Sequence, residues 1–175
     1  MRHPHWLTIQ RASLFLFLAV GVLLVIYALG FITGVYLFYA YGNEGLVDFY
    51  RYMQEINAGL LWKGITVMLF SCILFMLELG RRAAGIITLI LVVFISAASV
   101  FLSAGSLSLL AAAREEYSAL DLSSLNRYIE RGAIKYRYST LVYDMGLAGY
   151  GMLICSSLFL AITVICNAFT AKDGT

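Results

Sequence analysis

Four long apolar stretches account for most of this chain of 175 residues. They occupy residues 13–40, 60–79, 84–113 and 141–169. A helix needs about 20 apolar residues to cross the hydrocarbon core of a bilayer, which is about 30 Å thick, and each stretch meets that length. We therefore expect an all-α integral membrane protein with four transmembrane helices, folded as a single four-span domain over residues 1–175.

The composition agrees with this class and argues against several others. Hydrophobic residues make up 62% of the chain and charged residues 13%, whereas a soluble domain carries about 25% charged residues. Little chain remains outside the four stretches, so no separate soluble domain is expected. The net charge is only +2 and the basic residues are scattered, which argues against a nucleic-acid partner. The lipid bilayer is the expected environment.

Two of the three connections carry the pattern of a short amphipathic helix, with apolar residues at helical spacing and charges on the other face. These apolar residues are Phe49, Met53 and Ile56 in the first connection and Leu122, Leu125 and Ile129 in the third. Two interpretations are open. The helices could lie on the membrane surface and shield the end of the bundle, or they could form a docking face for a partner.

The basic residues that flank the spans predict the orientation. The second connection, residues 80–83, is too short for anything but a hairpin, and an even number of spans puts both termini on one side. Arg2 and Arg11 precede the first span with no acidic residue nearby. Because cytoplasmic flanks are enriched in arginine and lysine, we expect cytoplasmic termini and the two longer connections outside.

Small and polar residues recur every three or four positions along the spans. In lipid, small residues let helix backbones approach closely, and hydroxyl groups can form hydrogen bonds between helices. A repeat near 3.5 residues favours a left-handed bundle. We interpret the pattern as a packing seam; a hydrated path lined by serines and a groove for a lipid or apolar cofactor are the alternatives. The seam residues are Gly30, Gly34, Gly64, Ser71, Ser96, Ser99, Ser103, Ser106, Gly146, Gly149 and Ser156.

Three charged residues fall inside the predicted spans, where charge is costly and suggests function. Glu78 lies at the far edge of the second span, beside Arg81 and Arg82, and is expected to pair with them. Lys63 lies a few residues into the second span, and Asp144 lies a few residues into the fourth. Because both enter from the same side, we expect an ion pair between them. A site for ions, protons or a partner's charge is the alternative.

No catalytic constellation is evident in the sequence. The two histidines, His3 and His5, lie in the amino-terminal tail, and two ligands make a poor metal site. The spans contain many serines but no histidine to activate one as a nucleophile. We therefore predict no enzyme activity, no catalytic residue, no metal and no cofactor.

Two functions from different classes remain. The first is a non-catalytic accessory or structural subunit of a larger membrane protein assembly. It would pack through its small-residue helix faces against other integral membrane subunits or further copies of itself. The second is a small oligomeric transporter or channel with a serine-lined polar path.

Overall fold

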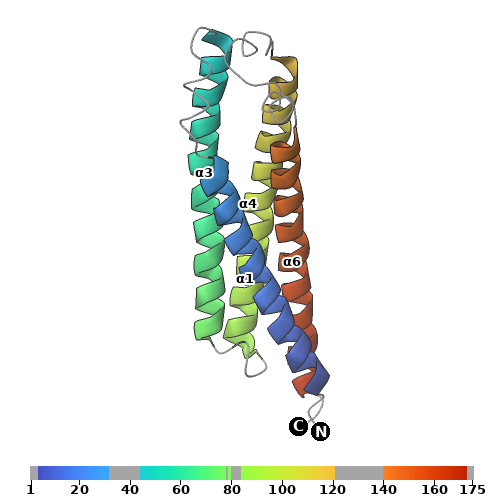
Figure 1. Ribbon diagram of the computed structural model, residues 1–175. Helices are drawn as coiled ribbons and strands as arrows, with labels where there is room; N and C mark the ends of the chain where they lie inside the picture. Colours follow the sequence, from blue (N-terminus) through green and yellow to red (C-terminus); the bar gives the residue numbers. More distant parts are fainter. Residues whose placement is uncertain (1–3, 32–43, 78, 80–83, 121–139, 173–175) are drawn as a thin grey trace.

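The computed structural model describes residues 4–31, 44–77, 79, 84–120 and 140–172. These residues form four helices, which are α1 (Pro4–Phe31), α3 (Glu44–Met76), α4 (Ile86–Ala119) and α6 (Leu141–Lys172). All four are long and apolar enough to cross a membrane, which confirms an all-helical chain with four spans. The start of α1 and the end of α6 lie at the same end of the molecule (Figure 1). The left-handed supercoil and the single-domain organisation stay predictions.

Helix α1 crosses the bundle diagonally and packs against both α3 and α6 (Figure 1). The most extensive contact is the antiparallel pair α4 and α6. The consecutive helices α3 and α4, by contrast, contact each other much less than α1 contacts either of its neighbours. In the described part of the chain, α1 is therefore what joins α3 to the α4–α6 pair.

Glycines allow α1 to approach its neighbours closely. A Cβ atom on Gly64 of α3 would lie 3.0 Å from Val25 Cγ2 and 3.2 Å from the Val25 backbone nitrogen of α1. A Cβ atom on Gly146 of α6 would collide with the Tyr27 hydroxyl of α1. Such close approach drives helix association in lipid, where apolar burial contributes little. These two positions do not tolerate a larger side chain without movement of α1.

Three of the helices are longer than a membrane span requires. Helices α3, α4 and α6 contain 33, 34 and 32 residues, or about 50 Å each at 1.5 Å per residue, against a hydrocarbon core of about 30 Å. The extra length lies at the end opposite the termini, where α3 exposes Asp48 and Arg51 and α4 exposes Arg114, Glu115 and Glu116. We call this end the head. It comprises residues 44–57, 110–119 and 141–146.

The apolar stripe of the first connection forms the core of the head. Residues 44–57 are the first half of α3 and continue into the span without a break, so they do not form the separate short helix that was expected. Phe49, Met53 and Ile56 are buried. The centroid of the Phe49 ring lies 5.8 Å from the centroid of the Tyr117 ring on α4. The docking-face and membrane-surface interpretations of these three residues are therefore both corrected.

The reason for this difference is the length of α4. This helix runs six residues past the predicted span end at residue 113 and reaches Ala119, so it offers an apolar partner above the membrane. The Tyr117 ring then contacts Tyr143 of α6 at 5.3 Å. The matching residues of the third connection, Leu122, Leu125 and Ile129, lie outside the described residues.

Removing the aromatic core of the head should destabilise the protein. We expect Phe49→Ala to lower the free energy of unfolding by about 3–5 kcal/mol, because it leaves a cavity beside Tyr117. Tyr52→Ala, at an exposed neighbouring position, should change it by less than about 1 kcal/mol. Denaturant unfolding of the two purified variants in one detergent measures both values. Equal losses would contradict a packed head.

Candidate functional site

The two charges predicted to pair have different partners in the structure. Lys63 Nζ donates a hydrogen bond to Ser106 Oγ of α4 at 3.1 Å. Asp144 instead accepts from Arg114 Nε of α4 at 2.7 Å, and from the Thr140 hydroxyl at 3.0 Å. The expected Lys63–Asp144 pair is thus replaced by two separate contacts.

The register of the helices explains this correction. Ser106 and Arg114 are eight residues apart on the same helix, which separates the two contacts by about 12 Å along α4. Asp144 belongs to the head, at the first turn of α6, where a carboxylate is favoured by the helix dipole. Its side chain is nearly half exposed, so its pair with Arg114 contributes little stability. We regard this pair as structural. Glu78 and its expected arginine partners lie outside the described residues, so Lys63 remains the charge of interest.

Lys63 belongs to a small group of polar side chains, which we call the Lys63 cluster: Lys63, Ser106 and Tyr150. Tyr150 is fully buried. Its hydroxyl donates to the Leu60 carbonyl of α3 at 3.3 Å and also interacts with Ser106. Three helices therefore supply this cluster, and the partner of the ammonium group in it is the neutral Ser106 hydroxyl. A cation whose acceptor is neutral is suited to bind an anion.

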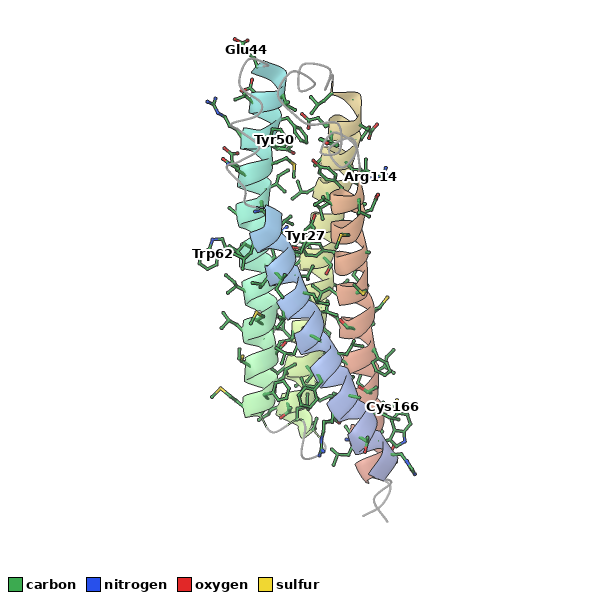
Figure 2. All side chains as sticks on the ribbon, viewed as in Figure 1. Tyr27, Glu44, Tyr50, Trp62, Arg114 and Cys166 are labelled. Atoms are coloured by element: carbon green, nitrogen blue, oxygen red, sulfur yellow. The ribbon has the colours of Figure 1, made fainter. Side chains whose placement is uncertain are left out.

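Tyr27 of α1 lies beside this cluster. Its side chain points between the helices at the middle of the bundle (Figure 2) and rests against Gly146 of α6. Sequence analysis did not single out Tyr27 or Tyr150, because a tyrosine in an apolar run resembles an interfacial aromatic residue. Only the register of α1 against α6 shows that they meet.

A second group of buried polar side chains joins the helices near the chain termini. Gln10 donates through Nε2 to the Leu79 carbonyl and accepts from Asn167 Nδ2 at 2.6 Å. One turn further along α1, the Ser13 and Thr163 hydroxyls are 2.9 Å apart. Sequence analysis placed Gln10 in the tail, before the first apolar stretch, and so missed this network. Amides and hydroxyls that satisfy one another in this way hold helices together and offer no reactive group.

Most of the predicted seam residues lie in the interior. Ser71, Ser103 and Ser106 donate to backbone carbonyls four residues earlier in their own helices, so these hydroxyls donate locally rather than across an interface. Ser106 alone of the three also accepts from another helix, through Lys63. Within the described residues, the Ser96 and Ser99 hydroxyls have no hydrogen-bond partner. The buried seam residues are Gly64, Ser71, Ser96, Ser99, Ser103, Ser106, Gly146 and Ser156, and Gly149 is half-buried.

Gly30 is the exception within the seam. It is exposed, and a Cβ atom built on it would have no neighbour within 4 Å. Gly34, its expected companion, lies outside the described residues. The close approach of α1 to α3 uses Gly21 instead, where a Cβ atom would lie 3.1 Å from Val67 Cγ1. Gly30 therefore takes no part in the packing of the described helices.

Among the described residues, His, Cys, Asp and Glu form no group of three or more that could hold a metal ion. The chain matches no known family model, no curated protein and no solved structure. The arrangement of its own residues is therefore the basis for a functional proposal.

Two double-mutant cycles separate the observed charge contacts from the expected one. We expect Arg114→Met and Asp144→Asn to show a coupling energy of about 0.2–1 kcal/mol, as for an exposed ion pair. Lys63→Met and Asp144→Asn should be additive within about 0.5 kcal/mol, because the groups do not touch. Unfolding free energies in detergent provide both values. Strong coupling in the second cycle alone would restore the predicted pair.

The contribution of the Gln10–Asn167 hydrogen bond to stability can also be measured. Asn167→Leu removes the donor to Gln10 and should cost about 1 kcal/mol, in the range of hydrogen bonds between membrane helices. Phe169→Leu, at an exposed position two residues from Asn167, should be close to neutral. Thermal unfolding of both variants in the same detergent tests the difference. A neutral Asn167→Leu would mean that the network contributes nothing.

Proposed function

We propose that this chain is a non-catalytic accessory or structural subunit of a larger membrane protein assembly. The observation that carries the proposal is an outward face of small residues on α4. Ala104, Gly105, Ser108 and Ala112 are exposed and share this face. A Cβ atom on Gly105 would meet nothing within 4 Å, so no contact in the described part of the chain requires a glycine there.

Such a face supports docking of another membrane helix. Glycine inside a helix costs about 1 kcal/mol relative to alanine, and lipid itself gains nothing from small side chains. Small residues at four-residue spacing instead let a second helix approach closely. The chain's own packing uses the opposite face of α4, where Ser99, Ser103 and Ser106 are buried. The outward face is therefore left available for another integral membrane subunit or a second copy of the chain.

The proposed orientation puts the termini in the cytoplasm and the head outside. Arg11 is exposed at the terminal end of α1, in keeping with the enrichment of basic residues on cytoplasmic flanks. The head carries both signs of charge, including Asp48, Arg51 and Arg114. In this orientation its charged surface is the part that an external partner or domain would meet.

A small transporter or channel is the second candidate. Ser96 and Ser99 support it, because their buried hydroxyls lack a partner among the described residues and could contact water in a polar path. However, large side chains such as Phe17, Leu153 and Leu160 are fully buried as well, and they fill the interior of the bundle. We therefore favour the accessory role. Ion or solute flux into liposomes containing the purified chain alone would reverse this preference.

Site-directed cross-linking tests the α4 face. Ser108→Cys is introduced into a background without Cys72, Cys155 and Cys166 and labelled with a thiol-reactive photo-cross-linker in native membranes. We expect a discrete protein adduct, because a partner helix lies against this face. Ala148→Cys is the matched control: it is a small, exposed position on α6, at a similar height to Ser108. It should give mainly lipid adducts.

Equal protein adducts at both positions would show that the α4 face is not special. Lipid adducts alone at Ser108→Cys would contradict the accessory role through this face. The mass of a discrete adduct also separates the two partner types, since twice the chain mass of 19.4 kDa indicates a second copy.

A further inference from the structure

Lys63 carries a charge whose counter-ion is missing from the described part of the chain. Its side chain is half-buried, and its polar contact there is the neutral Ser106 hydroxyl. The ion pairs of the described residues, Arg51 with Asp48 and Arg114 with Asp144, involve other cations. A cation in or next to hydrocarbon is costly without an opposite charge. The Lys63 cluster is therefore complementary to an anion that comes from outside it.

The depth of the cluster suggests which anion this is. Along α4, exposed large apolar side chains extend from Ile86 to Leu109, a distance of about 35 Å at 1.5 Å per residue, close to the thickness of a bilayer core. Ser106 lies one turn from the head end of this band. Trp62, the neighbour of Lys63, is 69% exposed and points away from the bundle (Figure 2), as tryptophans do at membrane interfaces. Lys63 therefore lies at the level of lipid headgroups.

The arrangement of the helices also leaves this position accessible. Lys63 and Ser106 bridge α3 and α4, the neighbouring helices with limited contact. Leu69 and Ile73 of α3 lie on the same face as Trp62 but nearer the middle of the membrane, and they expose apolar surface, against which acyl chains can pack. Polar and apolar parts are thus ordered as in a phospholipid, with the charge at the headgroup level and apolar side chains beside it.

We propose that Lys63 and Ser106 form a binding site for the headgroup phosphate of an anionic phospholipid, on the head side of the membrane between α3 and α4. The ammonium group of Lys63 binds a phosphate oxygen, and the Ser106 hydroxyl holds the ammonium group in place. A zwitterionic lipid carries its own cation beside the phosphate, so the site prefers a lipid with net negative charge. This site is independent of the outward face of α4.

Competition between two lipids tests the site directly. The purified full chain, exchanged into detergent with equal amounts of phosphatidylglycerol and phosphatidylcholine, is analysed by native mass spectrometry. We expect one retained phosphatidylglycerol, preferred about fivefold over phosphatidylcholine, as for one basic residue at an anionic surface. Lys63→Met should abolish the preference and Lys63→Arg should keep it. Arg51→Met, which removes an exposed cation from the same helix, is the matched control and should also keep it.

A second measurement leaves Lys63 intact, so it does not depend on how the Lys63 variants fold. The chain has two tryptophans, and Trp6→Phe leaves Trp62 as the single fluorophore beside the site. In vesicles with equal amounts of the two lipids, brominated phosphatidylglycerol should quench Trp62 more than brominated phosphatidylcholine does. Equal quenching, or equal lipid retention by wild type and Lys63→Met, would overturn the proposal. So would a lipid-free complex in which a partner's carboxylate cross-links to Lys63.

Discussion

The hydrogen bonds of Gln10 determine which parts of the chain lie beside α1 at the terminal end of the bundle. Its side chain binds Asn167 of α6 and the Leu79 carbonyl, at the end of the second predicted span. One side chain of α1 thereby joins two other parts of the chain at the terminal end of the bundle. Lipid is as apolar as the helix surfaces, so burial alone does not select these neighbours. Polar contacts and close backbone approach do so instead, and α1 provides both.

The bundle lies in two solvents, and each part is stabilised accordingly. In the head, charged side chains are exposed, and Phe49, Tyr117 and Tyr143 form an apolar core of the kind found in soluble proteins. Within the apolar band, the interior combines large apolar side chains such as Phe17 and Leu160 with close backbone approach at Gly21 and Gly64 and with buried hydroxyl groups. The Lys63 cluster lies where the two regimes meet. This position explains why a charge can be kept there and why it needs a partner from the lipid or from another chain.

Sequence patterns predicted the spans well, because lipid allows few alternatives to a long apolar helix. They did not predict where the helices end. The charges at Asp48 and Arg51 fit a helix on the membrane surface as well as one that rises into water, and only the length of α4 distinguishes the two. The partners of Lys63 and Asp144 depend on the register between helices, which periodicity within one helix does not contain. Gln10 was missed because hydropathy placed it outside the first span.

The distance in sequence between the partners of α1 affects how the protein reaches its fold. Gln10 and Ser13 belong to the first helix to be synthesised, and their side-chain partners on α6, Asn167 and Thr163, lie 157 and 150 residues later. Helix α1 can pair with α3 early through Gly21 and Gly64. The Ser13 hydroxyl can meanwhile donate to the Gln10 carbonyl within α1, and the Gln10 amide nitrogen can donate to the Leu79 carbonyl. The side-chain oxygen of Gln10, however, receives its donor from Asn167 only when α6 enters the membrane, and an unsatisfied polar group in hydrocarbon is costly. Insertion of α6 is therefore the step that completes this network, and a chain interrupted before it would leave the Gln10 oxygen to lipid or to the insertion machinery.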